Sequence, residues 1–200
     1  MKKIILIISL GIFAALFAVF AEQLLAVLVS IFWKKEIIFD YYGHLGIFLI
    51  AATLIEEGLK YSAIYFLFKE KFDLERARLW AASLTFGLFF GLTELLLIII
   101  SNEKLADLSA LSPEVIFSLA TIILIQALNA LLIGAFLASR FFSGKFIVLK
   151  ILFFPVLIHL LYNFLIIQKS NFTNWLVGIV LGITLITSLV IIAFNFRELD

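Results

Sequence analysis

Long apolar segments follow one another along this chain, and they limit its fold more than any other feature. They cover residues 4–21 with a continuation to 33, 44–68, 79–100, 115–139, 146–167 and 172–194. Most are about as long as the roughly 20 helical residues that cross a hydrocarbon core of about 30 Å. Backbone polar groups find no partners in lipid, so a crossing segment satisfies them as a helix. The sequence therefore predicts an all-α fold, a polytopic transmembrane helix bundle of about six spans that forms one domain over residues 1–200.

The composition excludes several other classes of protein. Apolar residues make up 64% of the chain and charged residues 14%, whereas a soluble domain needs more polar surface and a disordered chain contains fewer apolar residues. The net charge of +1 and the scattered basic residues argue against a nucleic-acid partner and leave the lipid bilayer as the expected one. The chain has no cysteine, so its chemistry depends on carboxylates, lysines, hydroxyls, amides and two histidines.

Basic residues outside the apolar segments predict the orientation. Lysine and arginine are concentrated at the N-terminus and in the second and fourth loops, which places both termini in the cytoplasm by the positive-inside rule. Residues 1–21 also have the three regions of a signal peptide, which leaves open whether they are retained. Glu22 follows them, and we expect it at the outer interface without a special role. His44 is expected to be an interfacial residue as well.

Polar side chains inside the apolar segments are the strongest indication of function. Each buried Glu or Lys costs about 2.5–3.5 kcal/mol at the centre of a membrane, so these groups are expected to face inward, paired or hydrated. The second segment contains Glu56, Glu57 and Lys60, the third contains Glu94, the fourth contains Gln126 and Asn129, and the fifth contains His159 and Asn163.

Helical spacing predicts which of these side chains share a face. Glu57 stacks with Lys60, and His159 lies four residues before Asn163. One lysine cannot neutralise three glutamates, so the remaining carboxylates need a proton, a metal ion, an imidazole or water. Gln126 is expected to join helices through hydrogen bonds, as is the neighbouring Asn129. Small residues on the third segment (Gly87 and Gly91) and on the fourth (Ala130, Gly134 and Ala138) let these helices approach closely.

Two carboxylates beside an imidazole can activate water. Glu56 or Glu57 can take a proton from the attacking water, and His159 can stabilise the charge that develops or donate a proton to the reacting group. The Asn163 amide can donate a hydrogen bond to the developing oxyanion. A metal version of the site would use Glu57, Glu94 and His159 as ligands of a zinc ion. Neither version is decided by the sequence.

Three short motifs occur in order on successive polar segments. Residues 56–60 (EEGLK) match EExxK, residues 90–94 (FGLTE) match FxxxE, and residues 159–163 (HLLYN) match HxxxN. This arrangement resembles the PrsW family of membrane proteases, which is related to the CAAX-prenyl endopeptidase and bacteriocin-processing (CPBP) superfamily. Lys60 and Glu94 favour the PrsW side, because that superfamily typically has EExxxR and FxxxH. The resemblance covers about residues 44–167.

The resemblance implies intramembrane or membrane-proximal cleavage of a membrane-anchored protein such as an anti-sigma factor, in a prokaryotic cell membrane. Carried over by motif, Glu56 and Glu57 are the catalytic pair, Glu94 and His159 complete the site, and Asn163 is an oxyanion donor.

The chain also departs from the wider superfamily. The superfamily's second intramembrane histidine is absent, and Gln126 is the nearest polar occupant. Whether the site binds a zinc ion therefore stays open. A catalytically inactive membrane adaptor is one alternative. Another is a transporter coupled to protons or ions, in which Glu57, Glu94 and His159 relay protons.

Overall fold

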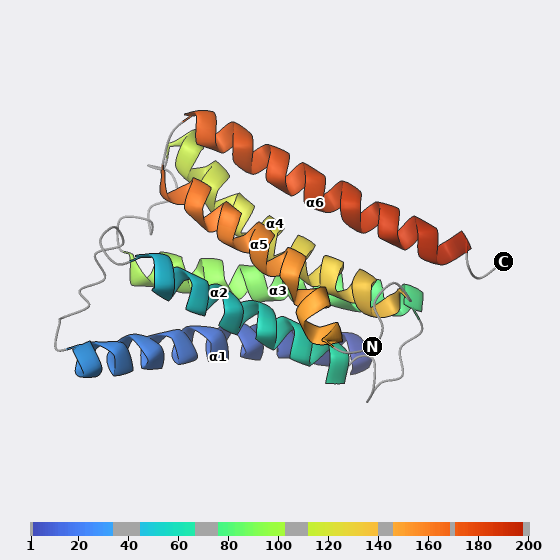
Figure 1. Cartoon of the computed structure of the whole chain (residues 1–200), viewed down its shortest axis with the longest axis horizontal. Coiled ribbons are helices and arrows are strands. Elements are labelled where there is room, and N and C mark those ends of the chain that lie inside the picture. Colours follow the sequence, from blue (N-terminus) through green and yellow to red (C-terminus); the bar gives the residue numbers. More distant parts are fainter. Residues whose placement is uncertain are drawn as a thin grey trace.

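The computed structural model describes residues 2–33, 45–66, 76–102, 112–139, 146–168 and 171–197, and within these ranges it contains helices and no strands (Figure 1). His44 and most of the connecting segments lie outside the described residues, and with them most of the basic residues that predict the orientation. The helices are α1 (Lys2–Trp33), α2 (Leu45–Ser62), α3 (Arg76–Ser101), α4 (Pro113–Ala138), α5 (Ile147–Ile167) and α6 (Asn171–Arg197).

Five of these helices, α1 and α3 to α6, are long and apolar enough to cross a membrane. The all-helical, membrane-type fold expected from the sequence is therefore confirmed. The remaining helix, α2, has 18 residues and includes Glu56, Glu57 and Lys60, so it combines the length of a short span with an unusual charge content. Residues 63–66 continue it as a π-helical turn.

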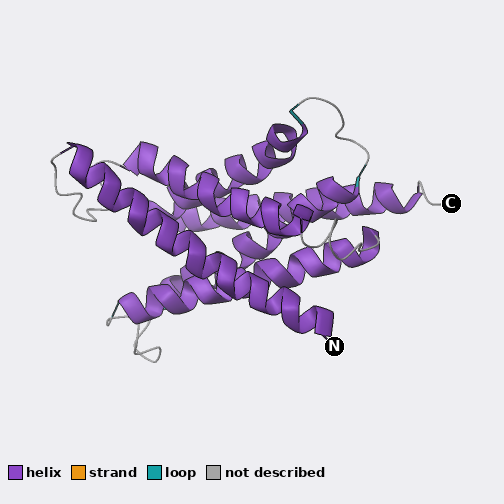
Figure 2. Ribbon diagram, turned by 90° about the horizontal axis from the view of Figure 1, so that it is seen from below, coloured by secondary structure: helices purple, strands orange, loops and turns teal. Residues whose placement is uncertain are grey.

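Helix α4 lies at the centre of the bundle. It contacts α2, α3, α5 and α6, while α1 packs on α2 and α3. Every residue of α4 from Ile125 to Ala138 is buried, which is the pattern of a helix covered on all sides. Figure 1 shows α6 and α1 on opposite sides of the bundle, and Figure 2 shows the same helices from below. Many large apolar side chains on the outer helices, such as Phe17, Phe164 and Ile186, are exposed, as expected for surfaces that face lipid.

Small residues bring α3 and α4 together, as their spacing predicts. A Cβ atom at Gly87 would lie 2.6 Å from the Ala130 Cβ, and one at Gly91 would lie 2.8 Å from the Ile123 Cα. A Cβ atom at Gly134 would lie 2.3 Å from the Ser83 hydroxyl oxygen. Lipid supplies no hydrophobic force between helices, so this close packing is what stabilises the pair. The neighbouring polar residues, Glu94 on α3 and Gln126 on α4, are thereby held near one another.

Candidate active site

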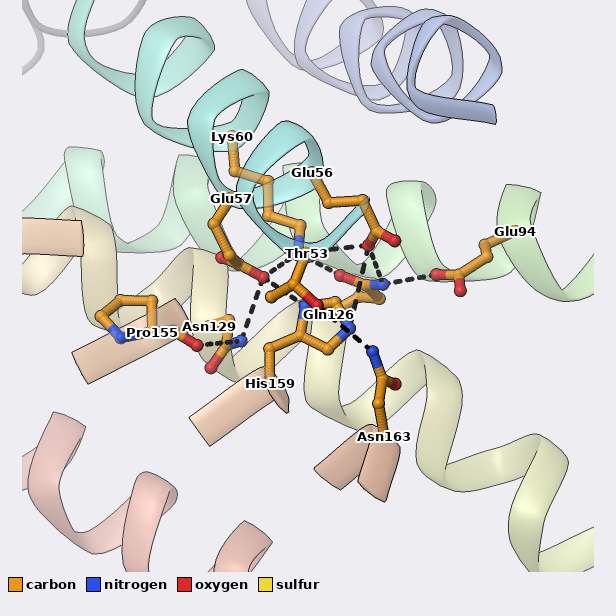
Figure 3. A network of polar contacts seen from close by, with 10 residues as sticks. All are labelled: Thr53, Glu56, Glu57, Lys60, Glu94, Gln126, Asn129, Pro155, His159 and Asn163. Carbon is orange, nitrogen blue, oxygen red and sulfur yellow. Dashed lines mark hydrogen bonds and ion pairs between the residues drawn. The ribbon is translucent and has the colours of Figure 1, made fainter. Parts of the chain in front are cut away.

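Lys60 lies at the centre of a buried polar cluster that α2 supplies with three charged side chains (Figure 3). Its ammonium nitrogen lies 2.6 Å from Glu57 Oε1 and 4.0 Å from Glu56 Oε2, and it also donates to Gln126 Oε1. The same nitrogen lies 4.9 Å from the centre of the Phe90 ring. Lys60 is 0% exposed, so its charge is balanced entirely by these neighbours.

Gln126 on α4 connects the cation to two carboxylates. Its Oε1 accepts from Lys60, while its Nε2 donates to Glu56 Oε2 at 2.7 Å and to Glu94 Oε2 on α3. The orientation of this amide is fixed chemically, because only the oxygen can face an ammonium group and only the nitrogen can face carboxylates. Gln126 therefore joins α2, α3 and α4, as expected of a residue that links helices.

Glu57 and His159 form the closest pair between α2 and α5. His159 Nδ1 lies 2.7 Å from Glu57 Oε1, which also accepts from Asn129 Nδ2 at 3.1 Å. Asn129 Nδ2 donates in addition to the backbone oxygen of Pro155, one turn before His159, at 3.2 Å. Glu57 is 0% and His159 2% exposed, so both groups are removed from bulk solvent.

The second nitrogen of His159 faces the other carboxylate. His159 Nε2 lies 3.9 Å from Glu56 Oε2, which is outside hydrogen-bond distance. An ionised carboxylate only accepts, so Nδ1 carries the hydrogen toward Glu57, and Nε2 keeps a lone pair when the ring is neutral. The ring is thus oriented by one glutamate and presents its basic nitrogen to the other.

The cluster becomes more accessible on the side of Glu56. Glu56 is 9% exposed, and Glu94 and Asn163 are partly buried. Asn163, one turn after His159 on α5, places its Nδ2 3.5 Å from the Thr53 hydroxyl on α2, at the limit of a hydrogen bond. One N–H of this amide points to Thr53, so the second N–H is available to donate to another oxygen on this side.

The structure brings together most of the residues that the sequence selected. Glu56, Glu57, Lys60, Gln126 and His159 are in direct contact or within 4.0 Å of a cluster member.

Glu94 reaches this group through the Gln126 amide. The three residues considered as zinc ligands are not assembled, since no group of His, Asp and Glu side chains in the described ranges could hold a metal ion. Lys60 Nζ already occupies the position of a cation beside Glu57. In this arrangement the donor set does not fit zinc.

Glu22 is the residue that the sequence analysis missed. We expected it at the outer interface without a special role, but the structure places its side chain beside the polar cluster. The Glu22 carboxylate on α1 interacts electrostatically with Glu56 and Lys60, and also with Glu94, and its Oε1 atom is buried. The sequence signal was present, because Glu22 is an acidic residue inside a 32-residue apolar helix, but span length alone placed it at a boundary.

No protein-family model, curated protein or solved structure matches this chain.

Proposed function

We propose that this protein is an integral membrane endopeptidase, which hydrolyses a peptide bond of a membrane-anchored protein by glutamate- and histidine-activated water. The observation that supports it most is the ordered set Glu57, His159 and Glu56, in which a buried carboxylate orients an imidazole toward a second, more accessible carboxylate. The PrsW-like order of the motifs agrees with this chemistry and suggests a prokaryotic protein with six spans, both termini in the cytoplasm and a substrate such as an anti-sigma factor.

The attacking water would sit between His159 Nε2 and Glu56 Oε2. These atoms are 3.9 Å apart, so one water oxygen can lie within about 2.8 Å of both. As the water oxygen bonds to the substrate carbonyl carbon, its proton passes to one of these two bases and the carbonyl oxygen becomes an oxyanion. The same proton is then given to the leaving nitrogen as the C–N bond breaks, which yields a carboxylic acid and an amine, and the acid then releases its remaining proton to water.

The neighbouring side chains have distinct roles in this scheme. Glu57 holds the Nδ1 hydrogen of His159 and stabilises the imidazolium that forms when Nε2 takes the proton. Asn163 supplies N–H groups to the oxyanion from one turn along the same helix. Lys60 balances the charge of Glu57 and keeps both α2 carboxylates in place. No step requires a metal ion.

Cleavage of a single-span substrate in liposomes tests the proposal. The wild-type protein should cut the substrate, and Glu57→Ala and His159→Ala should each abolish cutting. Thr121→Val is a matched control that should retain cutting, because it removes a buried hydrogen bond between α4 and α5, Thr121 to Tyr162 at 3.0 Å, and changes neither the carboxylates nor His159. Retained cutting by both Ala variants would refute the assignment.

A proton-coupled transporter is the second candidate, and one contact favours it. Glu94 on α3 and Glu56 on α2 share the Gln126 amide, so carboxyl groups of two helices belong to one network, to which His159 on α5 is bonded through Glu57. Proton flux into liposomes that is lost in Glu94→Gln, together with absence of cleavage, would support this function instead. An inactive adaptor would keep its function in Glu57→Gln.

A further inference from the structure

Two oxygen atoms deep in the cluster have no hydrogen-bond donor among the residues that the structure describes. They are Glu57 Oε2 and Asn129 Oδ1, and both residues are 0% exposed. Figure 3 shows both atoms on the side of the network nearest Pro155, away from Glu94 and Asn163. Buried oxygens of this kind normally have a partner in the protein or in bound water. Two of them on neighbouring, hydrogen-bonded residues therefore mark a place where a donor binds.

The contacts that Asn129 does make fix the direction of its free oxygen. Its Nδ2 donates to Glu57 Oε1 at 3.1 Å and to the backbone oxygen of Pro155 at 3.2 Å. Rotating the amide by 180° would place Oδ1 against these two acceptors, so only the nitrogen can occupy that position. The Asn129 Oδ1 atom therefore points away from Glu57 Oε1 and the Pro155 oxygen. Both of these atoms are acceptors, so neither can donate a hydrogen bond to Oδ1.

The same reasoning applies to the carboxylate. Glu57 Oε1 takes hydrogens from Lys60 at 2.6 Å, from His159 at 2.7 Å and from Asn129 at 3.1 Å. These donors leave Oε2 as the oxygen of Glu57 with unused lone pairs.

The geometry points to a binding site for one internal water molecule, which donates one hydrogen to Glu57 Oε2 and the other to Asn129 Oδ1. A neutral donor suits the site because Lys60 already balances the charge of Glu57. A water molecule has two hydrogens for these two acceptors, and buried waters commonly bridge such groups. This water molecule is separate from the proposed attacking water, whose position is between His159 Nε2 and Glu56 Oε2.

The site makes Asn129 a positioning residue. Through its amide it holds one oxygen of Glu57, and through the water it holds the other, so the plane of the carboxylate is fixed. His159 in turn takes its ring orientation from Glu57 Oε1. The consequence for catalysis rests on the proposed function, whereas the water site itself does not.

Infrared spectroscopy with H₂¹⁸O exchange tests the water site without any substrate. Wild-type protein in lipid nanodiscs should show a water O–H stretching band that shifts in H₂¹⁸O and persists after bulk water is removed. Asn129→Leu should lose this band, because the water keeps only one acceptor. Thr121→Val, which removes a hydrogen bond elsewhere on α4, should retain it. The same band in Asn129→Leu would overturn the assignment.

A high-resolution structure of the unmodified protein gives a second test that does not depend on any variant folding. We expect a density peak at about 2.6–3.2 Å from both Glu57 Oε2 and Asn129 Oδ1. An empty position, or a rotated Asn129 whose nitrogen faces Oε2, would refute the inference. A melting temperature that is higher in Na⁺ buffer than in choline buffer would also refute the inference, because it would identify the occupant of the site as a cation. If the protein cleaves no substrate, the proposed function is refuted, but the infrared band and the density peak still test the water site.

Discussion

Replacing Lys60 with methionine is the most direct perturbation of the cluster, because the two side chains are similar in length and only one is charged. The substitution leaves Glu57 buried with no cation at 2.6 Å. Removing one partner of a buried ion pair typically costs about 3–5 kcal/mol. This cost has an upper limit, because Glu57 binds a proton once its unpaired charge costs more than proton uptake does. For a glutamate with the ordinary pKa of about 4.3, binding a proton at pH 7 costs about 3.7 kcal/mol. We therefore expect Lys60→Met to lower the free energy of unfolding by about 3–4 kcal/mol at pH 7.

Reversible unfolding in mixed micelles measures this change, and the double variant Lys60→Met with Glu57→Gln is its control. The double variant removes both charges, so it should recover much of the lost stability. Because the single variant folds with an extra proton, its deficit should decrease by about 1.4 kcal/mol for each pH unit below 7, down to about pH 5. A deficit below about 1 kcal/mol, or one that the second substitution does not reduce, would refute the charge balance inferred here.

Further predictions concern packing, the missed carboxylate and the bridging amide. Gly87→Ala should lower the free energy of unfolding by about 1–3 kcal/mol, because the new Cβ would lie 2.7 Å from the backbone oxygen of Gln126; Gly178→Ala, with nothing within 4 Å, should stay within about 0.5 kcal/mol. Glu22→Gln should raise the free energy of unfolding at pH 7 by on the order of 1 kcal/mol, because glutamine needs neither a charge nor a bound proton beside Glu56. An unchanged free energy would place Glu22 outside the cluster. Gln126→Leu should lower the free energy of unfolding by about 3 kcal/mol or more and reduce cleavage in the liposome assay, since it removes a hydrogen bond from three charged groups, Lys60 and Glu56 on α2 and Glu94 on α3. Wild-type values would contradict the bridging role.

Helical spacing and the cost of buried charge predicted much of this arrangement. Glu57, Lys60 and His159 could be expected to meet, because each is too polar for lipid and each shares a face with another polar residue. The mediating role of Gln126 between Glu56 and Glu94 could not be predicted, since it depends on the relative heights of α2, α3 and α4. Those heights are set by small-residue contacts such as Gly87 against α4, and sequence spacing gives only the face of each contact.

Glu22 was misjudged for a related reason. Counting residues from the start of an apolar run gives depth only for a helix perpendicular to the membrane, and α1 continues without interruption to Trp33. A helix of this length can tilt, and its tilt determines which neighbour an acidic side chain meets.

The length of α1 has a further consequence. Its 32 residues extend about 48 Å, well beyond the roughly 30 Å of a hydrocarbon core. A change in bilayer thickness alters the mismatch that this helix accommodates by tilting or by extending past the lipid. Since α1 carries an acidic side chain close to Glu56, thinner and thicker membranes should hold that acidic group at different distances from the polar cluster. The length of the lipid chains should therefore change the electrostatic interaction between Glu22 and the polar cluster.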